Sequence, residues 1–149
     1  MIEFNNLTTI SIDEEFFKKN TEKILEGENK KELDLSIALV GQGRIRELNK
    51  KYKRKNRVTD VLAFPESKVL MEKFRVGPTK KIRGLGEIVI CLSEVKKNAK
   101  RFSLTFEKEL ARVLIHGILH LLGYDHEKSK EGEREMEKKE NYYLEKVFK

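Results

Sequence analysis

All three histidines of the chain, His116, His120 and His126, lie within a stretch of eleven residues. His116 and His120 are four residues apart, a spacing that places both imidazoles on one face of an α-helix, one turn apart. Gly123 suits a left-handed helix end, after which the chain can turn back and present His126 from a third direction. Three neutral imidazoles that leave a fourth position open are typical of a catalytic zinc site. The spacing therefore predicts one Zn²⁺ ion on His116, His120 and His126.

The same stretch matches the metzincin peptidase motif H-E-x-x-H-x-x-G-x-x-H at its three histidines and its glycine, but not at its glutamate. Gly117 stands where a peptidase has its general base. The metal geometry is retained, and the residue that would activate water for peptide hydrolysis is missing. Three histidines at ligand spacing, with none elsewhere, are also hard to explain as core residues. A metal enzyme other than a peptidase is therefore favoured.

The excess of positive charge is confined to the middle of the chain. Net charge is +7, and residues 51–100 carry 14 basic against 5 acidic side chains, while residues 1–50 have a net charge of −2. A localised basic surface is typical of a protein that binds a polyanion. The densest run is Lys50 to Arg57, for which a solvated helix end is the alternative explanation. We predict RNA phosphate contacts for five of its side chains: Lys51, Lys53, Arg54, Lys55 and Arg57.

Composition restricts the class of protein. The chain has 149 residues, of which 38% are hydrophobic and 38% charged, as expected for one globular domain spanning residues 1–149. Cys91 is the single cysteine, so no intrachain disulfide can form, and its apolar surroundings indicate a small buried side chain. No apolar stretch approaches the roughly 20 residues that span a bilayer. No secretory signal is visible at the N-terminus. We expect a cytoplasmic protein without a membrane partner.

The elements that must position the histidines can be read from hydrophobic periodicity. An almost wholly apolar helix, beginning near Thr105 and continuing to Leu122, should be central, buried and the support of the metal site. Further helices are predicted for residues 13–27, 44–52, from 93 onwards, and 127–149. Strands are predicted for residues 1–7, 33–40, 61–65 and 85–92. We therefore predict an α/β (α+β) fold: one domain with a small mixed sheet of about four strands and about five helices.

Two further segments carry charge next to these elements. Asp60 opens an apolar strand, where its carboxylate could either cap a turn or stand behind the metal site and orient a ligand imidazole. Sequence alone leaves both roles open. Residues 66–84 show no clear periodicity and several cations. They are expected to form a mobile basic connection, of the kind that often serves as a lid or binding loop.

Taken together, these motifs resemble the YbeY family of rRNA-maturation endoribonucleases. The resemblance rests on Leu48-Asn49, on residues 59–65 (Thr-Asp-Val-Leu-Ala-Phe-Pro), on residues 85–91, and above all on His116 to His126. It implies a single-strand-specific, metal-dependent endoribonuclease that acts in small-subunit (16S) rRNA maturation, especially at the 3′ end, and in ribosome quality control. It also implies zinc on the three histidines, and single-stranded RNA, small-subunit rRNA or the ribosomal subunit as partner.

The chain departs from the family pattern where an arginine is common shortly before the Thr-Asp pair. Lys53 stands there, with Arg54 next to it, and either cation could offset charge that develops on a phosphate. Asp125 and Asp60 are candidates for moving the proton, and the attacking group is either water at the metal or the 2′-hydroxyl of the RNA. We expect Lys53, Arg54 and Asp125 to be catalytic.

Two other functions compete with a nuclease. A non-catalytic ribosome-associated RNA-binding factor with a structural metal would share the basic surface and would need no general base. Structural zinc sites, however, usually have four protein ligands, and no fourth ligand is evident here. A zinc peptidase would share the histidine spacing but not the glutamate, and it ranks last.

Overall fold

The protein is described here from a computed structural model, which describes residues 1–66, 84–125, 127 and 129–148. Its elements, in chain order, are β1 (Ile2–Asn6), α1 (Glu14–Gly27), β2 (Asp34–Val40), α2 (Gln42–Lys53), β3 (Val61–Pro65), β4 (Gly84–Cys91), α4 (Leu92–Arg101), α5 (Phe106–Leu121) and α6 (Lys130–Val147). The described part of the chain thus has five helices and four strands in one mixed sheet, and the predicted α/β single-domain fold is confirmed.

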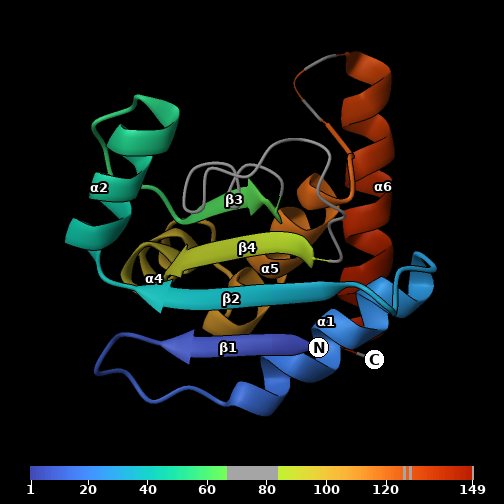
Figure 1. Ribbon diagram of the computed structural model, residues 1–149, viewed down its shortest axis with the longest axis horizontal. Helices are drawn as coiled ribbons and strands as arrows, with labels where there is room; N and C mark the ends of the chain where they lie inside the picture. Colours follow the sequence, from blue (N-terminus) through green and yellow to red (C-terminus); the bar gives the residue numbers. More distant parts are fainter. Residues whose placement is uncertain (67–83, 126, 128, 149) are drawn as a thin grey trace.

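The sheet has the strand order β1-β2-β4-β3. β1, β2 and β4 run parallel, and β3 pairs with β4 in the antiparallel direction at one edge. Figure 1 shows the four strands side by side, with α2 and α6 on opposite sides of β3 in this view. β4 is buried on both faces over its apolar end, residues 88–91, whereas β2 alternates buried and half-buried residues until its buried end at Leu39 and Val40.

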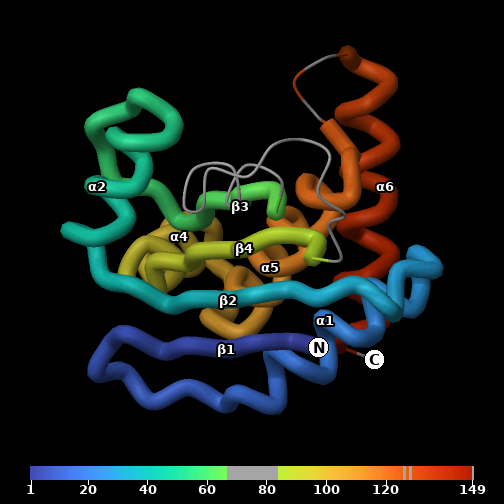
Figure 2. The backbone as a smooth tube through the Cα atoms, in the orientation of Figure 1, coloured from blue at the N-terminus to red at the C-terminus, as the bar shows by residue number. Residues whose placement is uncertain are grey.

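Two apolar clusters cover the two faces of the sheet. On one face, Ile37 and Ile88 pack with side chains of α1, α4, α5 and α6. On the other, Val89 and Cys91 pack with Leu62, Phe64 and Ile45 of α2. Cys91 is fully buried, as the sequence indicated. The helix layer holds α5 against the sheet, and α2 brings the basic run to the strand β3; Figure 2 traces the chain from α2 through residues 54–60 into β3.

The predicted central helix is α5. The Thr105 hydroxyl caps it by accepting a hydrogen bond from the Lys108 backbone N–H at 3.1 Å. The helix contacts α1, α4, α6, β3 and β4. At Gly117 it approaches the sheet closely, because a Cβ added there would lie 3.2 Å from Ile88 Cδ1. A rigid helix fixed on every side is the support that a precise site needs.

Several helix boundaries differ from the sequence prediction. α2 begins at Gln42, two residues before the predicted start at residue 44, so Gln42 and Gly43 belong to the first turn of the helix. Gly41 serves as the N-cap without a side chain, and the buried Ile45 anchors that turn. α6 begins at Lys130 rather than Glu127, because the Ser129 hydroxyl caps it by accepting from the Gly132 N–H.

Residues 67–83 of the predicted basic connection lie outside the described residues, and so does His126. Among the helices that the structure describes, none is long and apolar enough to cross a bilayer.

Candidate active site

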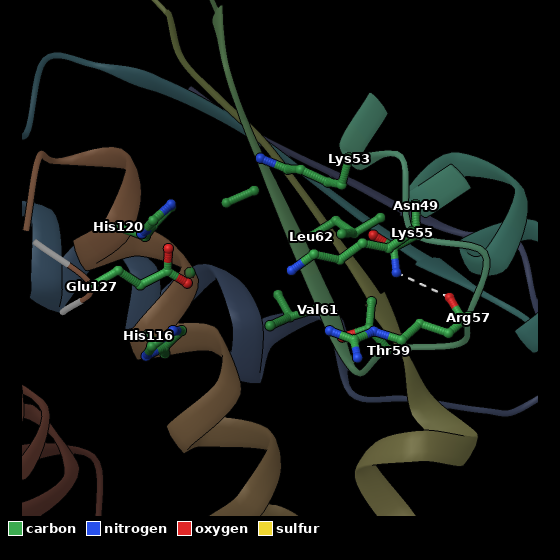
Figure 3. A pocket seen from close by; sticks show the side chains of 12 residues that line it. Asn49, Lys53, Lys55, Arg57, Thr59, Val61, Leu62, His116, His120 and Glu127 are labelled. Atoms are coloured by element: carbon green, nitrogen blue, oxygen red, sulfur yellow. Dashed lines mark hydrogen bonds between the residues drawn. The ribbon is translucent and has the colours of Figure 1, made fainter. Parts of the chain in front are cut away.

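A pocket of about 320 Å³ separates the histidine-bearing end of α5 from the basic connection between α2 and β3. Figure 3 shows His116 and His120 on one side and the cationic side chains on the other, with β3 between them. The pocket thus brings together residues that are more than 50 positions apart in sequence. Its lining consists of Asn49, Lys53, Lys55, Arg57, Thr59, Val61, Leu62, Ala63, His116, Gly117, His120 and Glu127.

The structure places both imidazoles on one face of α5. Their rings are stacked, with centroids 6.5 Å apart and planes inclined by 10°. His116 is about one-quarter exposed and His120 is exposed, so solvent and solutes can reach the pair. Within the described residues, which leave out His126, no three His, Cys, Asp or Glu side chains are arranged so that they could hold a metal ion. The three-histidine ligand set therefore stays a prediction.

A carboxylate that the sequence reasoning missed stands behind His116. Glu140 of α6 lies with its Oε1 2.5 Å from His116 Nδ1. Because a carboxylate only accepts hydrogen bonds, this contact places the proton on Nδ1 and leaves Nε2 as the nitrogen available to a ligand. The sequence did contain a signal. Glu140 is four residues after Met136 and three before Tyr143, the two buried residues of α6, so it sits on the inward face of that helix.

One turn before His116, α5 carries an ion pair that the sequence also did not reveal. Arg112 donates to Glu109 at 2.7 Å through Nε and at 2.9 Å through a terminal nitrogen, and the Glu109 side chain is fully buried. The hydrogen bond to Glu109 raises the pKa of Arg112 against the opposing effect of burial, and the negative charges of Asp60 and Glu140 add to the rise. Arg112 is therefore a permanent cation beside the histidine end of the helix.

The two roles left open for Asp60 can now be compared. Its carboxylate accepts from the Asn98 side chain at 3.4 Å and from the Thr59 hydroxyl at 3.5 Å, and its backbone carbonyl accepts from the Cys91 N–H. The carboxylate that holds an imidazole is that of Glu140. The structure therefore favours a local role for Asp60, which ties the start of β3 to α4.

Three of the predicted RNA-contacting residues line the pocket: Lys53, Lys55 and Arg57. Their connection is shaped by Asn49, which is 3% exposed. Its side-chain amide donates to the Arg57 backbone carbonyl at 3.0 Å, and its backbone carbonyl accepts from the Lys55 N–H at 3.2 Å. Figure 3 shows the first of these bonds and the three cationic side chains extending from the connection.

The other two predicted contacts, Lys51 and Arg54, are not among the residues that line the pocket. Lys51 lies over the Tyr52 ring, with its Nζ 5.1 Å from the centroid. Arg54 has a left-handed backbone, with φ of 58°, and ends α2. Of the two candidate catalytic cations Lys53 and Arg54, Lys53 lines the pocket.

The loop after α5 contributes a second residue that the sequence reasoning missed, Glu127. Figure 3 shows its carboxylate extending between His116 and His120 into the pocket that it lines. The predicted catalytic residue Asp125 is not among the lining residues. Its Oδ1 accepts from the Glu127 N–H at 2.8 Å, which shapes the turn. The clue to Glu127 was its position directly after His126.

A buried carboxylate fixes the other end of this loop. Glu28, at the end of α1, accepts from the Tyr124 hydroxyl at 2.6 Å, from Lys139 Nζ at 3.0 Å and from the Tyr143 hydroxyl. Burial would raise the pKa of Glu28, but these three hydrogen bonds outweigh burial and the pKa is lowered. Tyr124 directly precedes Asp125, so Glu28 anchors the loop to α1 and α6.

The known proteins that are similar to this chain come from the family that its sequence motifs resemble. The family model described as "Endoribonuclease YbeY" matches residues 2–148. A protein of that name from Sulfurihydrogenibium sp. is 42% identical over 120 residues, which cover 80% of this chain and 74% of the relative. One from Persephonella marina is 44% identical over 119 residues, covering 80% and 73%. A Thermotoga maritima protein whose structure was determined in solution is 36% identical, with a TM-score of 0.68, over 99% of this chain and 89% of that one.

Proposed function

The chain belongs to the YbeY family of endoribonucleases, and on that premise we propose that it matures the 3′ end of small-subunit (16S) rRNA by metal-assisted cleavage of single-stranded RNA. A part in ribosome quality control belongs to the same proposal. The observation that carries it is one pocket with two accessible imidazoles on one wall and three cations on the other. A ribosomal substrate also suggests the cytoplasm as the place of action.

The cationic wall suits an RNA phosphate backbone. Lys53, Lys55 and Arg57 come from one short connection, so they can contact neighbouring phosphates of a strand that enters the pocket. Such contacts supply affinity without reading the base sequence. Single-stranded substrate is favoured because the strand must bring a phosphodiester between the cations and the imidazoles of a pocket of only about 320 Å³.

The donor set fits a zinc ion. His116 and His120 present imidazole nitrogens, which are common zinc ligands, from one face of α5. Because Glu140 contacts Nδ1 of His116, Nε2 is the nitrogen that is available to the ion. His126, which lies outside the described residues, is proposed as the third ligand. A bound Zn²⁺ supplies Lewis-acid polarisation of a phosphate oxygen and lowers the pKa of a water molecule.

The protein's own side chains would orient and stabilise the phosphate. Lys53 lines the pocket opposite the imidazoles, and its Nζ lies 5.8 Å from the Phe64 ring centroid. We assign to Lys53 the role of offsetting the negative charge that develops on the phosphate oxygens. Arg54 is not among the residues that line the pocket, so it is the weaker of the two candidates. Asp125 keeps its proposed part in proton movement, supported by its place in the loop beside Glu127.

Peptide hydrolysis is disfavoured by the packing at Gly117. A glutamate there would have to place its Cβ within 3.2 to 3.5 Å of three carbon atoms of Ile88, so a side chain at the position of the peptidase base would require the Ile88 side chain to shift. Cleavage of a peptide bond also does not require the three cations on the opposite wall of the pocket.

The proposal can be tested with an RNA that spans the mature 3′ end of small-subunit rRNA. The purified protein should cut the single strand, lose activity on chelation and regain it with added Zn²⁺. The same RNA annealed to its complement should be spared. Cleavage of both forms at equal rates would contradict single-strand specificity, and cleavage that survives chelation would contradict the metal site. A cyclic phosphate end would identify the 2′-hydroxyl as the attacking group.

A further inference from the structure

His116 is held from behind by a charged group of another helix. Glu140 of α6 lies 2.5 Å from His116 Nδ1, and its side chain is only 15% exposed. A contact of this kind restricts both the rotation of the imidazole and the choice of tautomer. It does so from the side opposite the nitrogen that faces the pocket.

The neighbouring ion pair is poorly explained by stability. Glu109 is fully buried, and the cost of removing its carboxylate from water offsets much of its attraction to Arg112, whose side chain is 36% exposed. Apolar side chains would fill the same place in this otherwise apolar helix at least as well. The bidentate hydrogen bond does fix the position of the Arg112 guanidinium.

The fixed guanidinium lies where it can act on Glu140. Arg112 precedes His116 by four residues, so the two side chains share one face of α5. Glu140 and Asp60 both act electrostatically on Arg112, in addition to its bonded partner Glu109. One cation thus serves carboxylates from three elements: α5, α6 and the start of β3.

We propose that Glu140 is a positioning residue, which holds the His116 imidazole with Nδ1–H toward α6 and Nε2 toward the pocket, and that Arg112, whose position is fixed by Glu109, helps to hold the Glu140 carboxylate in place. The inference rests on the proposed zinc site, because it assigns these residues a task there. It also gives α6 a function, since this helix contributes no residue to the pocket lining of the described chain.

The tautomer can be measured without metal or activity. Nitrogen NMR of ¹⁵N-histidine-labelled, metal-free protein is recorded at a pH where imidazoles are neutral, and His116→Ala identifies the His116 signals. The wild type should show the proton on Nδ1. Glu140→Ala should show exchange between both tautomers, whereas Glu137→Ala, an exposed glutamate of the same helix, should match the wild type. An Nε2–H tautomer in the wild type, or an unchanged one in Glu140→Ala, would overturn the proposal.

Zinc affinity, measured by competition with a chromophoric chelator, gives the second readout. Glu140→Ala should weaken zinc binding roughly 10- to 100-fold, and Glu140→Gln should recover part of the loss because its carbonyl still accepts from Nδ1–H. If the wild type binds no zinc, the proposed function fails. If the wild type binds zinc and Glu140→Ala binds it equally well, only this inference fails.

The part of Arg112 requires a variant that folds. Replacing Arg112 alone would strand the buried Glu109, so both are changed together, as Glu109→Gln with Arg112→Gln. This pair should weaken zinc binding several-fold in the wild-type background and much less in the Glu140→Ala background. Circular dichroism checks the fold of each variant. Equal losses in both backgrounds would contradict action through Glu140.

Discussion

Gly117 is the residue that distinguishes the histidine motif of this chain from that of a zinc peptidase. It lies between the two ligand histidines of the predicted site, at the place where a metzincin peptidase has its base. The structure adds a packing reason for the glycine, because α5 touches Ile88 of β4 at this point. The close contact between α5 and the sheet thus favours glycine over glutamate at position 117.

A methyl group at this position should therefore destabilise the fold. Gly117→Ala is expected to lower the free energy of unfolding by about 1–3 kcal/mol through overpacking, although alanine favours helices. Urea unfolding measures the change. Gly43→Ala is the control, since Gly43 is also helical but a Cβ there meets nothing within 4 Å. Equal or greater stability of Gly117→Ala would show that the helix can move away from the sheet.

Lys53 and Arg54 test which cation serves the pocket. Lys53→Ala should reduce RNA cleavage and lower the slope of log affinity against log salt by about 0.7, the value for one phosphate contact to a single strand. Arg54→Asn removes a charge while tolerating the left-handed backbone, and it should change both quantities little. Filter binding at several salt concentrations provides the measurement. A larger effect at Arg54 would reverse the assignment.

At the scale of elements, the connection between α2 and β3 is shaped by one buried side chain. The Asn49 side-chain amide donates to the Arg57 carbonyl, while the Asn49 backbone carbonyl accepts from the Lys55 N–H. The resemblance to the YbeY family already pointed to this residue. The structure explains its role, because its two hydrogen bonds fix the backbone at Lys55 and Arg57, whose side chains line the pocket.

Removing the Asn49 side chain should disturb substrate binding more than chemistry. Asn49→Ala leaves the Arg57 carbonyl without its donor and is expected to raise KM for RNA several-fold with a smaller change in kcat. The cost in stability should be about 1–3 kcal/mol. Asn56→Ala, which removes an exposed bond to Arg46 in the same connection, is the control. A selective loss of kcat would indicate that Asn49 contacts the reacting phosphate.

The Glu28 cluster links α1, the histidine loop and α6, and it makes their association dependent on pH. The folded-state pKa of Glu28 is lowered from an ordinary value of 4.5, so its contribution to stability is present above that value and lost as pH falls through the lower folded-state pKa. The stability difference between wild type and Glu28→Gln should therefore shrink below about pH 4.5. Thermal unfolding across pH tests this, and a difference that grows on acidification would contradict it.

At the scale of the whole molecule, local patterns predicted the elements but not their assembly. The apolar helix predicted from near Thr105 to Leu122 and the strand predicted for residues 85–92 agree with α5 and β4 to within one residue at each end, and the two histidines lie on one helix face as expected. The strand order β1-β2-β4-β3 depends on pairing between distant segments, which periodicity does not encode. Glu140 was missed for the same reason, because its partner lies 24 residues away.

Charge shows the same division between pattern and assembly. The middle third carries the whole positive excess, and three of its cations face the pocket. Their common position arises only because α2 ends beside β3 and α5 passes on the other side of that strand. Charge asymmetry thus predicts a polyanion ligand, whereas the fold determines which cations line the pocket.

The most direct test of the central claim is a paired measurement of zinc content and RNA cleavage in the wild type and in His120→Ala. His120 is exposed, so its loss should leave the fold intact, as thermal unfolding can verify. Our account predicts one zinc per chain and cleavage of single-stranded rRNA 3′-end RNA in the wild type, and the loss of both in the variant. A folded His120→Ala protein that cuts this RNA at the wild-type rate would show that the pocket is not the nuclease site.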